Sequence, residues 1–283
     1  MSVRMGPVSG SDRFRLRGGS PPKRRYGQHF LSSPAHARSI VERFAPSRED
    51  RVVEIGPGRG ALTIPLAGRC ARLVALEIDP RLAAPLAERL SGKPGVEVRL
   101  ADALAVDWHE LARELGGPLR VIGNLPYNAA TPIVRRLLAC DAVREAFVML
   151  QLEVAQRFLS PPGRRSYGPL AIVAALRSER RRVAVVPPGA FHPRPRVRSA
   201  IVRFSAKDDP PLPAHEIPRL ERWLHAGFSA RRKTLLANLR KHRDTVARFL
   251  EERGLRADAR AEALAPIDWL DLARRLEAEG ASP

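Results

Sequence analysis

An alternation of short apolar runs with helical segments between residues 51 and 150 constrains the fold more than any other feature of the sequence. Strands are predicted at 51–55, 72–78, 96–100, 119–122 and 146–150. Helices are predicted between them, ending near Leu66 and near Leu90 and spanning Thr131 to Leu138. This alternation is typical of a parallel sheet with helices on both faces, so the expected fold class is α/β.

The first predicted strand leads into a glycine-rich loop, Glu54 to Gly60. Glycines permit a tight turn and let a ligand approach the backbone at the N-terminus of the next helix. Gly56 and Gly58 also satisfy part of the dinucleotide-binding fingerprint. The loop alone therefore indicates a nucleotide-type ligand without choosing between cofactors.

Acidic residues end the next two predicted strands. Glu77 could accept both hydroxyls of a ribose, and Asp102 could accept the amine of an adenine ring. The alternative for each is a cap of the helix that follows. Because open α/β sheets bind ligands at the carboxyl ends of their strands, we favour a site that fits NAD and S-adenosylmethionine equally well.

The fourth predicted strand leads into Asn124, Leu125, Pro126 and Tyr127. Pro126 lacks an N–H and biases the preceding residue towards an extended conformation, so the chain leaves the strand in a fixed turn. The Asn124 amide, the Leu125 carbonyl and the Tyr127 ring could then hold a planar exocyclic amine; the alternative is an ordinary proline turn with the tyrosine in the core. Hydride transfer has no evident use for such a cage, whereas methyl transfer to a base nitrogen does, which favours S-adenosylmethionine over NAD.

The chain is strongly basic, with 49 Lys and Arg against 30 Asp and Glu and a formal net charge of +19. Basic side chains that neutralise phosphates release counterions, so this charge favours a nucleic-acid partner. Most of the basic residues are arginine, a skew that genome composition can also produce. A basic protein without a nucleic-acid partner is therefore the alternative.

Other features of the composition predict a soluble, cytoplasmic protein without a metal site. No run of about 18 apolar residues exists, so we expect no membrane segment. Cys70 and Cys140 are far apart and lack metal-ligand spacing, which indicates reduced thiols.

Three parts are predicted along the chain. Residues 1–22 form a basic tail expected to be disordered, for which an organellar transit peptide is the second interpretation. Residues 23–207 form the sheet domain, beginning with a helix at 34–44. Residues 208–283 begin with a proline-rich linker and then show apolar residues at helical spacing, which predicts a small helical domain.

A proline-rich segment, residues 187–195, joins two further predicted strands at 182–186 and 197–204. Its prolines would stiffen the loop and could aim Phe191 at a ligand. The alternative is that Phe191 simply packs in the core.

Taken together, the motifs resemble the ribosomal RNA adenine N6-dimethyltransferases. The resemblance runs from about Arg25 to Leu239. The stretches that carry it are 54–63, 77–79, Asp102, 124–127, 151–153, 191–199 and 228–235. Their pattern is closest to the bacterial small-subunit (16S) enzymes, and one departure is His29, where the family often has asparagine.

The resemblance implies a Rossmann-like class I S-adenosylmethionine-dependent methyltransferase sheet with a small C-terminal α-helical domain. It implies S-adenosylmethionine as the cofactor, bound by His29, Leu31, Gly56, Gly58, Glu77, Asp102 and Asn124. The implied catalytic residues are Asn124, Leu125, Pro126, Tyr127 and Phe191. We expect the target adenine to be flipped into the pocket and stacked on Tyr127 and Phe191 while the Asn124 amide oxygen and the Leu125 carbonyl accept its N6 hydrogens.

The implied partner is 16S rRNA in the small ribosomal subunit or its precursor, and the protein is expected to act as a monomer. Phosphate contacts are expected from Lys23, Arg24, Arg25, Arg194, Arg196, Arg198, Arg231, Arg232 and Lys233, each of which could instead be solvated surface charge. The alternatives for function are a 23S rRNA methyltransferase of the macrolide-resistance type, a ribosome-assembly factor with a vestigial cofactor pocket, and an NAD-dependent oxidoreductase.

Overall fold

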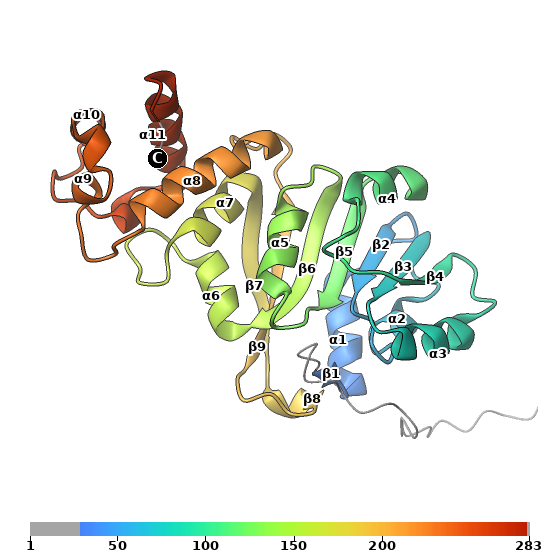
Figure 1. Cartoon of the computed structure of the whole chain (residues 1–283). Coiled ribbons are helices and arrows are strands. Elements are labelled where there is room, and N and C mark those ends of the chain that lie inside the picture. Colours follow the sequence, from blue (N-terminus) through green and yellow to red (C-terminus); the bar gives the residue numbers. More distant parts are fainter. Residues whose placement is uncertain (1–28, 282–283) are drawn as a thin grey trace, which may run out of the picture.

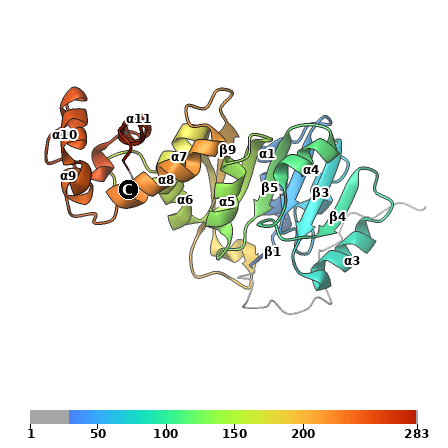
Figure 2. The same cartoon turned by 45° about the horizontal axis from the view of Figure 1, so that its top comes forward.

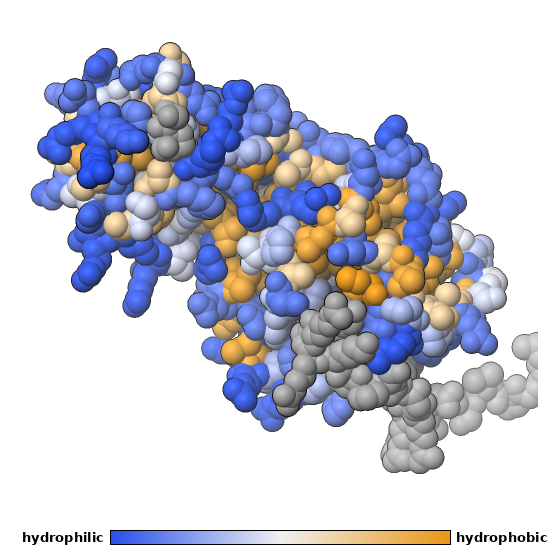
Figure 3. Space-filling model, viewed as in Figure 1, coloured by the Kyte–Doolittle hydropathy of each residue, from blue (hydrophilic) through white to orange (hydrophobic). Residues whose placement is uncertain are grey.

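The computed structural model describes residues 29–281, and the basic tail and Lys23 to Arg25 lie outside this range. A seven-stranded sheet forms the centre, and a helical domain stands beyond one edge of it, at the opposite end from strand β4 (Val96–Leu100) (Figures 1 and 2). On the face seen in Figure 3 the helical domain is mostly hydrophilic, and apolar surface gathers over the sheet domain.

The central sheet has the strand order β4-β3-β2-β5-β6-β9-β7. Its other strands are β2 (Arg51–Ile55), β3 (Arg72–Glu77), β5 (Leu119–Asn124), β6 (Val143–Gln151), β7 (Ser178–Val186) and β9 (Ser199–Ala206). Strands β4, β3, β2, β5 and β6 pair in parallel, whereas β9 pairs antiparallel with both β6 and β7. The predicted α/β class and the five parallel strands are confirmed.

The two faces of the sheet are covered by different helices. The helices of the sheet domain are α1 (Pro34–Phe44), α2 (Thr63–Leu66), α3 (Pro80–Leu90), α4 (Trp108–Leu115), α5 (Ala130–Leu138), α6 (Leu152–Leu159) and α7 (Pro169–Arg177). Helices α4, α5 and α6 bury their apolar sides in one core, and α1 and α2 form a second core on the opposite face. The sheet is therefore shielded from water on both faces, as its apolar strands require.

Three helices of this domain, α4, α6 and α7, were not predicted from the sequence. In α4 the signal was present, because Asp107 caps the helix by accepting from the backbone N–H groups of His109 and Glu110. Nearly all residues of α7 between Ala171 and Arg177 are buried. The helix therefore has no polar face whose spacing would reveal it in the sequence.

A two-stranded antiparallel sheet lies apart from the central one. Strand β1 (Phe30–Leu31) pairs with β8 (Phe191–His192), and the Ser32 N–H continues the contact by donating to the Ala190 carbonyl at 2.9 Å. We call residues 29–32 the strap. The strap holds the loop of residues 187–195 against the carboxyl ends of the central strands (Figure 1).

The helical domain contains α8 (Ile217–Gly227), α9 (Leu235–Asn238), α10 (Arg243–Glu252) and α11 (Pro266–Ala278). Its core is completed by α7 of the preceding domain, because Tyr167 just before α7 and Leu176 within it pack in the same cluster as Trp223 and Trp269. The packing of the helical part therefore begins before residue 208.

A buried arginine ties the linker to the sheet domain. Arg177 is 5% exposed and donates to the carbonyls of Leu138 and Leu212, each at 2.9 Å, and it forms an ion pair with Asp141. These bonds satisfy a charge that would otherwise be costly to bury. In residues 29–281, moreover, every helix is too short or too polar to cross a membrane.

Candidate active site

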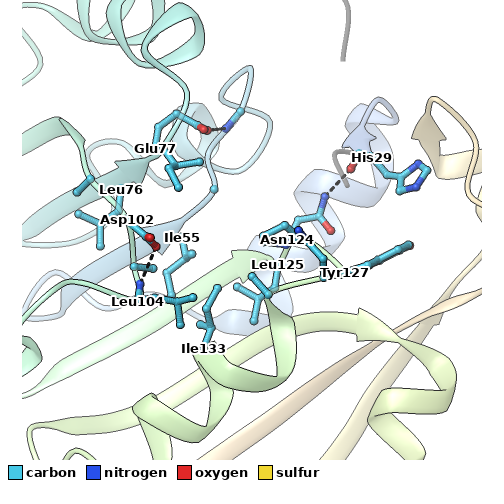
Figure 4. Close-up of a pocket in the computed structure, with 18 of the residues that line it drawn as sticks. His29, Ile55, Leu76, Glu77, Asp102, Leu104, Asn124, Leu125, Tyr127 and Ile133 are labelled. Carbon is cyan, nitrogen blue, oxygen red and sulfur yellow. Dashed lines mark hydrogen bonds between the residues drawn. The ribbon is translucent and has the colours of Figure 1, made fainter. Parts of the chain in front are cut away.

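A pocket opens where the loops after β2, β3, β4 and β5 meet (Figure 4). Its apolar lining includes Ile55, Leu76, Ile78, Leu104 and Ile133. Its polar lining includes His29, Glu77, Asp102, Asn124 and Tyr127. The structure therefore brings together, at one edge of the sheet, the residues that the sequence predicts at successive strand ends.

The loop after β2 approaches the pocket with its backbone. Gly56 and Gly58 have φ values of +68° and +56°, which L side chains rarely adopt. A Cβ atom built on Gly58 would lie 2.9 Å from the ring of Phe30 in the strap. The Gly58 N–H donates to Oε2 of Glu77 at 2.9 Å, so the loop after β2 is bonded to the end of β3.

Glu77 lies at the end of β3 and is 2% exposed. Its Oε1 accepts from the Asp79 N–H at 3.0 Å, and burial raises the pKa of the carboxyl while the Asp79 and Gly58 donors lower it. The cap of α3 is Asp79, which accepts from the Arg81 N–H. Glu77 is therefore not the helix cap, and both of its oxygens accept backbone N–H groups at the pocket.

Asp102 follows β4 and lies exposed on the pocket wall. Its Oδ1 accepts from the Leu104 N–H at 2.9 Å, within a tight turn. Helix α4 is capped instead by Asp107, so the helix-cap alternative does not hold for Asp102.

The Asn124 side chain has a fixed orientation. Its Nδ2 donates to the backbone carbonyl of His29 at 2.8 Å, and a carbonyl can only accept, so Oδ1 points away from the strap. The Leu125 N–H bonds the Met149 carbonyl at 3.3 Å. Within residues 29–281, neither Oδ1 of Asn124 nor the Leu125 carbonyl accepts a hydrogen bond. Two acceptors are thus available side by side.

Tyr127 stands beside these acceptors as a half-buried ring. Its hydroxyl shares a 2.8 Å hydrogen bond with Oγ of Ser199, and burial raises its pKa. The His29 ring lies against it, with the ring centroids 5.1 Å apart and the planes inclined by 36°. The sequence analysis did not identify Ser199, which comes from a strand 72 residues further along the chain.

Two residues expected at the site lie in the core instead. Phe191 is 4% exposed and Leu31 is 6% exposed, and both pack in the cluster beneath α1. Both belong to the β1–β8 pair, whose register places Leu31 opposite Phe191. The packed alternative therefore describes the Phe191 ring, which does not line the pocket.

The expected RNA-contacting residues within the described range are exposed. Arg194 lies in the loop of residues 187–195 and Arg196 and Arg198 follow it, whereas residues 231–233 lie on the helical domain. Arg231 forms an ion pair with Glu262 at 3.3 Å, so its charge is partly engaged within the protein.

Glu54 is a buried acid that the sequence analysis did not single out. Burial raises its pKa to about 8, the nearby Thr63 hydroxyl lowers it, and the Glu77 carboxyl raises it further. Its Oε2 has no hydrogen-bond partner among the described residues. No group of three or more His, Cys, Asp or Glu side chains in this range is arranged to hold a metal ion.

The sequence was then compared with known families and proteins. A family described as "Ribosomal RNA adenine dimethylase" matches residues 20–278. The chain belongs to this family. Within the ribosomal RNA adenine dimethylases, it is 40% identical over 256 residues to "Ribosomal RNA small subunit methyltransferase A" of Magnetococcus marinus, covering 90% of this chain and 92% of that one. The protein of the same name from Leptothrix cholodnii is 42% identical over 233 residues, 82% of each chain.

Solved structures give the same result for the fold. The 23S rRNA methyltransferase ErmE is 30% identical with a TM-score of 0.69, covering 88% of this chain and 99% of that one. A dimethyladenosine transferase from Plasmodium falciparum has a TM-score of 0.73 at 23% identity, covering 89% and 99%, which shows the shared fold. The chain is therefore an enzyme of a methyltransferase family, as predicted, and the NAD-dependent alternative is wrong.

Proposed function

We propose that the protein transfers methyl groups to the N6 amines of two adjacent adenosines in the 3′-terminal hairpin of 16S rRNA. The product is N6,N6-dimethyladenosine, formed during maturation of the small ribosomal subunit in the cytoplasm by a monomeric enzyme. The observation that carries the chemistry is the pair of unpartnered acceptors, Asn124 Oδ1 and the Leu125 carbonyl, beside the Tyr127 ring. The small-subunit target is supported by relatives that are 40% and 42% identical and carry a small-subunit name.

The pocket fits S-adenosylmethionine as the methyl donor. Glu77 offers carboxylate oxygens in the pocket lining for the ribose hydroxyls, and Asp102 offers an exposed carboxylate for the adenine amine. Ile78 and Leu104 supply apolar surface between these acids for a planar base. The glycine backbone of residues 56–58 lets the ligand approach closely.

When bound, the cofactor supplies an electrophilic methyl group on a sulfonium. The residues of the chain position the acceptor. Tyr127 stacks on the flipped adenine, which is worth about 1–3 kcal/mol for one base. In the first transfer Asn124 Oδ1 and the Leu125 carbonyl accept the two N6 hydrogens, which turns the nitrogen lone pair out of the ring plane. In the second transfer the amine has one N6 hydrogen left, and one of the two acceptors holds it. Pro126 fixes the turn that presents both acceptors.

No strong general base is needed in this mechanism. Two hydrogen-bond acceptors hold the amine, and the proton leaves to solvent after methyl transfer. Most of the rate enhancement then comes from holding the two reactants in a productive geometry. A stacking role for Phe191 would require its ring to leave the core position that it occupies here.

We propose further that the exposed arginines near the pocket and on the helical domain bind rRNA phosphates. Arg194, Arg196 and Arg198 are exposed in and after the loop that His29 contacts, while Arg231, Arg232 and Lys233 are exposed on the helical domain. The two groups together could hold separate parts of one folded RNA.

Similarity to ErmE, at 30% identity, favours 23S rRNA as the second candidate substrate. One experiment distinguishes the two. The protein is incubated with isotope-labelled S-adenosylmethionine and either unmethylated small subunits or unmethylated 23S rRNA, and the digested RNA is analysed by mass spectrometry. We expect four labelled methyl groups per small subunit, on two adjacent adenosines.

Two results would overturn the proposal. Label on 23S rRNA alone would assign the resistance-type activity. Binding to small subunits without any labelled product would leave the assembly-factor function.

A further inference from the structure

We infer that His29 is a positioning residue for the RNA substrate: its ring clamps the loop of residues 187–195 and supports Tyr127, while its carbonyl orients the amide of Asn124. This inference rests on the proposed function, and it gives His29 a role on the base side of the pocket rather than on the cofactor.

The strap contacts each of the parts that must meet during methyl transfer. The Phe30 ring packs against Gly58 of the cofactor loop, so closely that a Cβ atom on Gly58 would clash with it. The His29 carbonyl accepts from Nδ2 of Asn124 at 2.8 Å. The Ser32 N–H and hydroxyl both bond the Ala190 carbonyl, at 2.9 and 3.2 Å, in the loop that leads to the arginines.

The His29 ring adds a contact that no other strap residue makes. Its Nδ1 lies 2.7 Å from the carbonyl of Pro193. A carbonyl can only accept, so Nδ1 carries the proton and donates. The bond joins two segments 164 residues apart, directly next to Arg194.

The position of the ring separates it from the proposed cofactor contacts. In Figure 4 the His29 ring and Tyr127 lie on one side of Asn124, whereas Glu77 and Asp102 lie on the other. The ring packs against Tyr127 at 5.1 Å between centroids. Because Tyr127 is also held by Ser199 at 2.8 Å, the tyrosine is fixed from two directions, as a stacking platform requires.

Three substitutions of His29 test the contribution of the Nδ1 hydrogen bond separately from that of the aromatic ring. His29→Phe retains an aromatic ring but has no donor, and His29→Ala removes both. His29→Asn restores the donor, because the amide nitrogen of asparagine occupies the same place beyond Cγ as Nδ1 of histidine. His36→Ala is the control, since His36 lies seven residues away and bonds only Ser33 within its own helix cap.

Each variant is assayed with unmethylated small subunits for kcat and KM, and its affinity for S-adenosylmethionine is measured by calorimetry. For His29→Phe we expect the KM for the small subunit to rise about tenfold, the loss of about one hydrogen bond, with cofactor affinity within twofold of the wild type. His29→Ala should show a larger rise, His29→Asn should return KM towards the wild-type value, and His36→Ala should match the wild type.

Two outcomes would overturn the inference while the wild-type enzyme remains active. One is a wild-type KM for His29→Phe. The other is a loss of cofactor affinity that accounts for the whole defect, whether or not His29→Asn restores it. Absence of methylation by the wild type would instead overturn the proposed function, and this inference with it.

Discussion

At the scale of single residues, Asn124 shows how a neighbouring group fixes the orientation of a side-chain amide. An amide has a donor end and an acceptor end, and the His29 carbonyl engages the donor end. The acceptor is therefore directed to the pocket before any substrate arrives, so no reorientation is required during the reaction.

We expect Asn124→Ala to lower kcat at least 100-fold, since removal of one preorganised polar group from an active site costs about 10²–10³. RNA affinity should change little, because the phosphate contacts lie elsewhere. Methylation of small subunits and filter binding of 16S rRNA measure the two quantities. Turnover close to that of the wild type would remove Asn124 from the mechanism.

Glu54 gives a prediction for the pH dependence of stability. The carboxyl loses its proton near pH 4.5 in the unfolded chain and near pH 8 in the folded protein. Between these values the unfolded state binds fewer protons, so the free energy of unfolding falls as pH rises, by about 1.4 kcal/mol per pH unit.

We therefore expect Glu54→Gln to remove most of this decline between pH 5.5 and 7.5, measured by urea unfolding. Glu49→Gln makes the same substitution at an exposed site and serves as the control. Parallel stability profiles for the wild type and Glu54→Gln would show that the buried carboxyl does not hold its proton.

At the scale of elements, the glycine loop after β2 depends on the strap. Gly58→Ala would place a methyl group 2.9 Å from the Phe30 ring and would also strain a backbone with φ of +56°. Gly68 has φ of +79° and nothing within 4 Å, so Gly68→Ala introduces strain without the clash.

We expect Gly58→Ala to weaken S-adenosylmethionine binding at least tenfold in calorimetry, because the loop and the strap must move apart. Gly68→Ala should lower the melting temperature without this loss of affinity. Equal cofactor affinities for the two variants would mean that the contact between loop and strap is unimportant.

The elements also show what the sequence could predict. Glu77, Asp102 and Asn124 were found because strand–helix alternation places successive strand ends at one edge. The β1–β8 pair was missed, because two residues on each side carry no alternation and the partners are about 160 residues apart. Because this pairing was not predicted, the Phe191 ring was expected in the pocket. The pairing places the ring in the core.

At the scale of the whole molecule, exposed basic residues occur on both domains. Arg194, Arg196 and Arg198 lie in the sheet domain, and residues 231–233 lie in the helical domain. A protein that neutralises phosphates with both groups should bind RNA with a steep dependence on salt.

Replacing Arg231, Arg232 and Lys233 with glutamine should lower the slope of log K against log salt by about 1.4–1.8 units, since each phosphate contact contributes about 0.7–0.9. Two contacts are counted rather than three because Arg231 is paired with Glu262. The control replaces three exposed arginines away from both groups: Arg48 precedes β2, Arg113 lies in α4 before β5, and Arg144 lies at the start of β6. Equal slopes for both triple variants would place the RNA elsewhere.

Helix α7 belongs to the sheet domain by chain order and to the helical domain by packing. A chimaera of two family members joined at residue 207 would therefore pair one parent's α7 with the other parent's Trp223 and Trp269, leaving mismatched volumes in a shared core. A join before Tyr167 would keep that core from a single parent. An exchange of the helical domain between family members that keeps its packing intact must therefore carry α7 and the segment that follows it.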